Sequence, residues 1–135
     1  MKEQLLATLE NSQQYSLSVA EMMPANSYDF KPAGAGWTFR ELMHHIAYGI
    51  FWWKDNYVKG IKTEWEQPVV KDNKQDIIQY LEEAYTSLKN TIADGKLSDD
   101  VIKGFHASID HITHHRGQAV LYLRCKNIAP PEYTY

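Results

Sequence analysis

The sequence predicts an all-α protein, a four-helix bundle with long connections between its helices. Apolar residues recur at three- and four-residue spacings in four separate segments, which is the pattern of amphipathic helices. No window of four or more residues alternates cleanly between β-branched and polar positions, so strands are not expected. A chain of 135 residues is also the length that one hydrophobic core serves, and residues 1–135 should form a single domain.

A proline and a capping sequence mark the first two helices. The first is expected over about residues 3–23, because Pro24 closes it. The second should begin at Thr38, since the Thr-Phe-Arg-Glu sequence at residues 38–41 is a capping box in which hydroxyl and carboxylate satisfy reciprocal backbone donors. It should run to residue 57 or 58, just before Gly60.

Glycines also set the expected limits of the last two helices. The apolar stripe of the third helix spans residues 77–92, and Asp94 and Gly95 should end it. The fourth helix is expected after Gly104 and should run to about Lys126, with an extended tail beyond. The links before the second and third helices are a dozen residues or longer, so one or both are expected to cross the end of the bundle.

Charge and composition exclude several classes of partner. The formal net charge of −3 and the lack of a Lys/Arg cluster argue against nucleic acid. The longest apolar run, residues 42–53, is shorter than the roughly 20 residues that span a bilayer. The amino terminus has no apolar signal core, and the single cysteine, Cys125, cannot form an internal disulfide. A cytoplasmic protein without membrane contact is therefore expected.

The histidines are the main functional signal. All six lie in the second and fourth predicted helices: His44, His45, His106, His111, His114 and His115. Residues four apart on a helix differ by about 40° and about 6 Å, so His111 and His115 lean over one face. A third imidazole from the second helix would complete a three-ligand metal site with an open position. The same spacing also occurs on solvated helix faces, where no metal binds.

The neighbours of the histidine pair favour a site. The face that carries His111 and His115 continues with Gln118, Tyr122 and Cys125, a mixture of polar and aromatic groups. The aliphatic residues of this helix fall on a neighbouring stripe instead. One side of the helix is therefore expected to pack, and the other to line a site.

Two segments resemble a known family. The sequence Asp-His-Ile-Thr-His-His-Arg-Gly-Gln at residues 110–118, followed by Tyr-Leu-Arg at residues 122–124, is similar to the carboxy-terminal signature of the DinB/YfiT-like family. Residues 37–47, from Trp37 to Ala47, resemble the second-helix motif of that family, in which a histidine followed by Ile-Ala supplies a metal ligand. The resemblance covers nearly the whole chain.

The resemblance implies a bundle of unusual connectivity, often dimeric, with a divalent metal bound by three histidines. Carried over by position, these ligands are His45, His111 and His115. His44 is the alternative first ligand, because neighbours on a helix differ by about 100° and cannot both face one ion. His114 is not expected to bind, since the family pattern places the ligands four residues apart.

Four other residues near the expected site carry separate expectations. Asp110 and Glu41 could accept hydrogen bonds from the imidazole N–H groups. Cys125 lies about 15 Å further along the helix than His115, beyond coordination distance, and is expected to be a buried thiol. Gly49, one turn after His45, departs from the larger or acidic residue of many relatives and opens space near the metal.

These observations predict a divalent-metal-binding protein, with zinc the first choice and nickel or another ion the alternatives. The resemblance implies an enzyme that activates a small thiol for transfer to an electrophile. A metal-dependent hydrolase and a non-catalytic metal-binding or stress-response protein are the other interpretations. No carboxylate in a His-Glu-x-x-His pattern accompanies the ligands, which disfavours protease-like hydrolysis. No catalytic residue is identified.

Two partners are expected: a small-molecule substrate such as a low-molecular-weight thiol, and a second copy of the chain. The homodimer is predicted because several aromatic residues lack an obvious partner within a four-helix chain. These residues are Phe51, Trp52, Trp53, Trp65 and the tyrosines of the tail.

Overall fold

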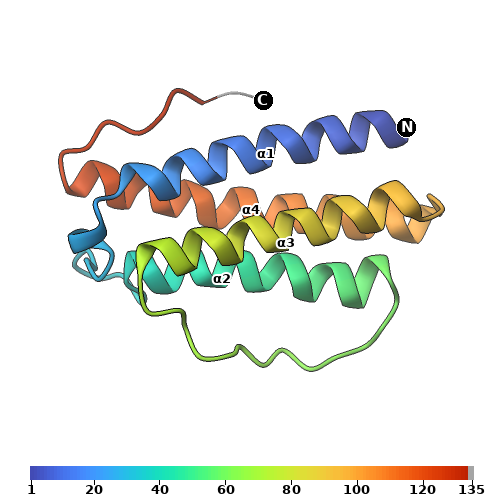
Figure 1. Cartoon of the computed structure of the whole chain (residues 1–135), viewed down its shortest axis with the longest axis horizontal. Helices are drawn as coiled ribbons and strands as arrows, with labels where there is room; N and C mark the ends of the chain where they lie inside the picture. The colour runs from blue at the N-terminus through green and yellow to red at the C-terminus, as the bar shows by residue number, and fades with distance from the viewer. Residues whose placement is uncertain (134–135) are drawn as a thin grey trace.

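The computed structural model describes residues 1–133, which form four α-helices and no strand. The helices are α1 (Lys2–Met22), α2 (Phe39–Trp53), α3 (Lys74–Asp94) and α4 (Asp99–Cys125). In the bundle, α1 and α2 each pack against both α3 and α4 (Figure 1). The predicted all-α four-helix fold is confirmed, and the expected extended tail is described only as far as Tyr133.

The connectivity of the bundle is set by its second link. Helices α2 and α3 run in the same direction, and residues 59–73 return along the outside of the bundle from the end of α2 to the start of α3 (Figure 1). The first link, residues 23–38, stays at one end of the bundle and contains the 3₁₀ helix η1 (Ala25–Ser27). The second link therefore covers the length of α2, which becomes important at the candidate site.

The start of α2 is fixed by the predicted capping box. The backbone N–H of Glu41 donates to Oγ1 of Thr38 over 3.1 Å, and the backbone N–H of Thr38 donates to Oε1 of Glu41 over 3.0 Å. The latter bond lowers the pKa of the Glu41 carboxyl. Beyond Trp53 the helix continues as the π-helical segment η2 (Lys54–Val58), so it ends where the sequence predicts.

The predicted start of α4 was wrong. The helix begins at Asp99 rather than after Gly104, and Ser98 caps it by accepting the backbone N–H of Val101 at Oγ over 3.2 Å. Gly104 lies inside the helix, where a Cβ atom would stand 2.7 Å from the carbonyl oxygen of Tyr57. This glycine permits close packing of α4 against η2, and it does not mark a helix boundary.

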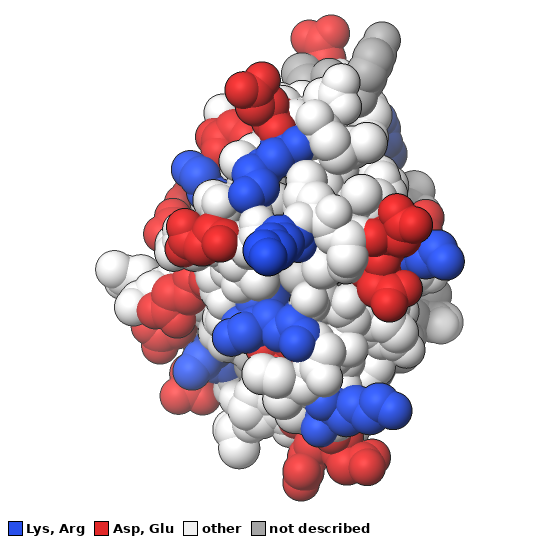
Figure 2. Space-filling view, turned by 90° about the vertical axis from the view of Figure 1, so that its right-hand side faces the viewer, with Lys and Arg blue, Asp and Glu red and all other residues white. Residues whose placement is uncertain are grey.

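The helices and one end of the bundle can be compared with the expected absence of membrane and nucleic-acid partners. Within residues 1–133, no helix is both long enough and apolar enough to cross a bilayer. Figure 2 shows the end of the bundle that lies at the right of Figure 1, where lysines and arginines are flanked by acidic side chains. This face presents mixed charge and no continuous basic surface of the kind that phosphate backbones bind.

Candidate metal centre

Three histidines from two helices converge at one point. The Nε2 atom of His45 in α2 lies 3.2 Å from Nε2 of His111 and 3.1 Å from Nε2 of His115, both in α4. One ring nitrogen from each histidine lies within 4.8 Å of the others. The packing of α2 against α4 thus brings together the three residues that the family resemblance named.

The spacing of these nitrogens fits a metal ion. Nitrogens that share a tetrahedral zinc at about 2.0–2.1 Å lie about 3.3 Å from one another, close to the separations found here. A ring nitrogen either donates one proton or accepts with one lone pair, so Nε2 of His45 can make only one of its two contacts as a hydrogen bond. A cation between the three lone pairs satisfies all three nitrogens, and the donor set could hold a divalent metal.

Glutamines contact the outer nitrogens of two of these histidines. Oε1 of Gln118 lies 2.8 Å from Nδ1 of His115, so this Nδ1 carries the proton and Nε2 presents its lone pair inward. The side-chain amide nitrogen of Gln67, in the link 59–73, lies 3.0 Å from Nδ1 of His45 and donates to it, so a metal at Nε2 of His45 would require the Gln67 amide to turn and accept through its oxygen. The sequence suggested Asp110 and Glu41 for this role, but Asp110 is exposed and Glu41 bonds to Thr38.

Burial keeps the three imidazoles neutral. Burial, followed by the proximity of the other histidines, lowers the pKa of His45 to about 3 and that of His111 to about 4. Burial also lowers the pKa of His115, and the hydrogen bond to Gln118 opposes this effect. Neutral imidazole is the form that binds metals, so near pH 7 no ligand has to lose a proton first.

Gly49 makes room for His111. A Cβ atom at position 49 would lie 2.5 Å from Cε1 and 2.7 Å from Nδ1 of the His111 ring, well inside van der Waals contact. The sequence predicted that this glycine opens space near the metal. In the structure, the His111 imidazole itself fills that space.

The other histidines lie elsewhere. His44 is fully buried on a different face of α2, where its ring stacks on Tyr80 at a centroid distance of 4.9 Å. The backbone N–H of Lys71 donates to Nδ1 of His44 over 3.4 Å. His106 and His114 are exposed. Of the two neighbours considered for the first ligand, His45 is therefore the one that meets His111 and His115.

A comparison with protein families agrees with this arrangement. The model of the DinB superfamily matches residues 8–119, which include the whole of α2 and the part of α4 that carries the histidines. The chain belongs to the DinB superfamily. No curated protein matches the sequence.

In this DinB-superfamily protein, tryptophans surround the three imidazoles. The ring centroid of Trp37 lies 4.4 Å from that of His45, and the centroid of Trp65 lies 5.4 Å from it. Trp53 lies 6.2 Å from His111 by the same measure. The sequence gave no role at the site to Trp37 or Trp65. Both lie in links whose path depends on the tertiary fold.

A cleft of about 620 Å³ opens beside His115. Trp37, His115 and Gln118 line it beside the histidine cluster, and Tyr122 and Cys125 line it further along α4. The expectation that Cys125 is buried was wrong, because this last residue of α4 is exposed. The cleft gives a small molecule access to the histidine cluster.

Proposed function

We propose that this DinB-superfamily protein binds one divalent cation through His45, His111 and His115 and activates a small thiol for transfer to an electrophile. The observation that supports the proposal is the convergence of three neutral imidazole nitrogens beside a cleft that can admit a small molecule. Three protein ligands leave a tetrahedral ion one position for a substrate, whereas structural sites use four protein ligands.

Zinc is the first candidate for the ion, with nickel or another divalent metal as the alternative. Imidazole is a ligand for all of these ions, and geometry selects among them more than affinity does. Within the described residues, the cluster contains histidines alone. The ion therefore keeps its full positive charge.

The chemistry of the site divides between the ion and the side chains. A bound divalent ion supplies Lewis acidity, which lowers the pKa of a thiol or of water. The thiol sulfur forms the new bond to the electrophilic carbon, the leaving group departs with its electron pair, and the thiol proton passes to solvent. Gln118 orients the His115 ring, and the Trp37 ring limits access of water to that ring.

Two other functions use the same site. A metal-dependent hydrolase would attack with water, but the histidine cluster contains no carboxylate to serve as a general base. A non-catalytic metal-binding or stress-response protein would bind the ion without turnover. The experiment below separates these functions.

The first test measures metal content and thiol transfer in the same preparations. Untagged protein should hold about one divalent ion per chain, and His111→Ala should lose it because only two ligands remain. His114→Ala is the matched control, since this exposed histidine on the same helix should leave the metal content unchanged. Metal-loaded protein should accelerate attack of cysteine or glutathione on an activated aryl chloride, and a chelator or His115→Ala should abolish the rate.

Each negative result has a distinct meaning. Stoichiometric metal in His111→Ala would contradict the three-histidine site. Full metal content without turnover of any thiol tested would contradict the transferase and favour the non-catalytic function. Metal-dependent release of product from esters, in place of thiol transfer, would favour the hydrolase.

A homodimer and a cytoplasmic location remain predictions. The original reason for the dimer is weakened, because Trp52 contacts the rings of both Trp53 and Trp65 within the chain. Exposed apolar side chains on η2 and the following link, among them Tyr57 and Val69, still support a dimer. Analytical ultracentrifugation should give twice the mass of the chain, and a monomer mass at all concentrations would contradict it.

A further inference from the structure

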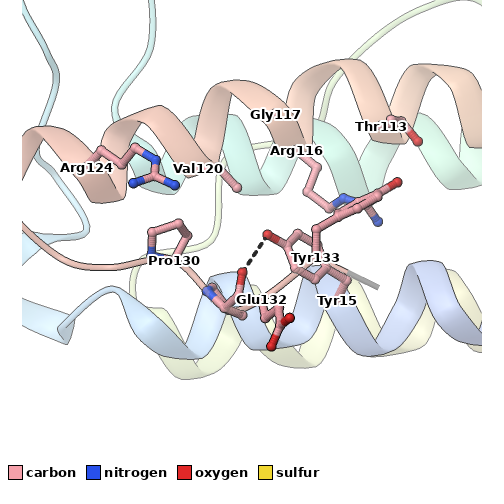
Figure 3. A pocket seen from close by; sticks show the side chains of 10 residues that line it. Tyr15, Thr113, Arg116, Gly117, Val120, Arg124, Pro130, Glu132 and Tyr133 are labelled. Atoms are coloured by element: carbon pink, nitrogen blue, oxygen red, sulfur yellow. Dashed lines mark hydrogen bonds between the residues drawn. The ribbon is translucent and has the colours of Figure 1, made fainter. Parts of the chain in front are cut away.

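A second pocket lies on another side of α4. It has a volume of about 450 Å³ and is enclosed by α1, α4 and the carboxy-terminal segment that includes Pro130 and Pro131 (Figure 3). Arg116 lines it, next in sequence to His115 but about 100° around the helix. The pocket is therefore separate from the histidine cluster.

Arg116 carries a buried positive charge with uncharged partners. The side chain is only 4% exposed, and its Nη1 donates to the carbonyl oxygen and to Oγ of Ser12 over 3.3 Å and 3.4 Å. Among residues 1–133, none of the ion pairs includes Arg116. A guanidinium has five N–H donors and keeps its charge in proteins, and a buried charge is costly unless an opposite charge compensates it.

The groups around Arg116 hold it in place without neutralising it. Its guanidinium carbon lies 4.9 Å from the ring centroid of Tyr15 and 5.6 Å from that of Tyr133. The Tyr15 hydroxyl donates to the carbonyl oxygen of Pro131 over 3.0 Å, which fixes the wall of the pocket (Figure 3). Burial raises the pKa of the nearby Tyr85 hydroxyl, so this group also stays uncharged.

A second guanidinium faces the same pocket. Arg124 projects from α4 two turns beyond Arg116, toward Pro130 (Figure 3). Val120 and the prolines provide an apolar wall between the two arginines. Glu132 is the one acidic residue among those that line the pocket, and it is exposed. The lining therefore has a net charge of one positive unit beside an apolar surface.

We propose that this pocket binds a small organic anion, a carboxylate or phosphate monoester with a short apolar body. The anionic group binds to Arg116, because the planar fork of a guanidinium matches two oxygens of a carboxylate or phosphate, and Arg124, two turns along α4, attracts it at longer range. The apolar body of the ligand packs on Val120 and Pro130. The inference concerns a site that the proposed metal chemistry does not use.

Calorimetric titration of the full chain with benzoate and with phenyl phosphate tests the proposal, and neutral benzyl alcohol is the control. Both anions should bind and benzyl alcohol should not, and the tighter of the two anions identifies the preferred group. Arg116→Gln should weaken binding about tenfold or more, since it removes a charge-assisted hydrogen bond, and Arg124→Gln should weaken it by a smaller factor, since it removes only a longer-range attraction. Metal content should be unchanged in Arg124→Gln, so failure here is distinguishable from failure of the metal site.

Because Arg116 is buried, its replacement also affects folding, and Gly117 provides a cleaner series. Gly117 lines the pocket, and a Cβ atom there meets no other atom within 4 Å. Gly117→Ala should bind as the wild type does, Gly117→Gln should bind more weakly, and Gly117→Glu most weakly because its charge repels the anion. The proposal would be overturned if the wild type bound neither anion at about 10 mM. It would also be overturned if Gly117→Glu and Arg124→Gln both bound the anions with wild-type affinity.

Discussion

His115 and Arg116 are neighbours in the sequence, yet burial has opposite consequences for their charges. The His115 imidazole responds to burial by a lowered pKa and stays neutral, so its lone pair can bind a cation. The Arg116 guanidinium cannot lose its proton and stays positive among uncharged partners. One face of α4 thus collects neutral donors for a cation, and another collects cationic donors for an anion. Whether a buried group can release its proton decides which kind of ligand it suits.

Acidification should have the largest effect on the difference between the two faces of α4, because it should release the metal from the histidines and leave the arginines charged. An ordinary imidazole pKa of about 6.5 alone would place the loss of metal near that pH. Since burial lowers the pKa of His45 to about 3 and of His111 to about 4, these two ligands should not reduce metal affinity from about pH 7.5 to about pH 5.5, and His115, whose pKa burial also lowers, should reduce it only below the ordinary value of about 6.5. Below that range it should fall by about tenfold per pH unit for each ligand that must lose a proton. Competition with a fluorescent zinc chelator at several pH values measures this.

Stability of the metal-free protein should follow the same groups. The unfolded chain takes up protons at these histidines near pH 6.5, whereas the folded chain does so only near the lowered values. The unfolded state therefore binds more protons between these limits, and the free energy of unfolding should decrease as the pH falls through them.

Binding of benzoate to the arginine pocket should not change over about pH 7.5 to 5.5, because guanidinium does not titrate there. A fall in metal affinity centred at pH 6.5 would contradict the buried, neutral cluster.

The matched pair Gly49→Ala and Gly117→Ala tests how packing differs between the histidine cluster and the arginine pocket. A methyl group at position 49 would overlap the His111 ring, so Gly49→Ala should displace it and weaken metal binding by about a hundredfold. At position 117 the methyl group enters open space, and Gly117→Ala should leave metal binding unchanged. It should also stabilise the fold by about 0.5–1 kcal/mol, because alanine favours helix over glycine.

Metal titration and thermal unfolding of the two variants provide the measurements. Wild-type metal affinity in Gly49→Ala would mean that the His111 ring can move without loss of the site. Lower stability in Gly117→Ala would mean that this glycine has a packing role that the structure does not show.

Much of the fold follows from local sequence, and the errors come from long-range packing. The capping box at Thr38 depends on four consecutive residues, so the sequence alone predicts the start of α2 correctly. Gly104 looks like a helix break in sequence, but the backbone of Tyr57 explains it, and that residue lies in another helix. The return of residues 59–73 along the bundle likewise depends on helix order, which periodicity does not encode.

The candidate site divides in the same way. His111 and His115 share a helix and can be paired from spacing, whereas the choice of His45 over His44 needed the family resemblance. Gln67 and Trp65 reach His45 from the long link, and no local pattern marks them. Residues on links are positioned by the tertiary structure, so sequence reasoning identified the three converging histidines better than their surroundings.

The smallest effect is expected at Gln118, which links the metal-binding face to its supporting hydrogen bonds. Gln118→Leu keeps the size of the side chain but removes the oxygen that accepts from Nδ1 of His115. Such outer partners fix the ring tautomer, and their loss should weaken metal affinity by about tenfold. Gln118→Glu retains an acceptor and should preserve the affinity, so the pair of variants separates the hydrogen bond from simple packing. Because the ligands themselves are untouched, the ion should still bind at about one per chain, and equal affinity in Gln118→Leu and the wild type would show that burial alone orients His115.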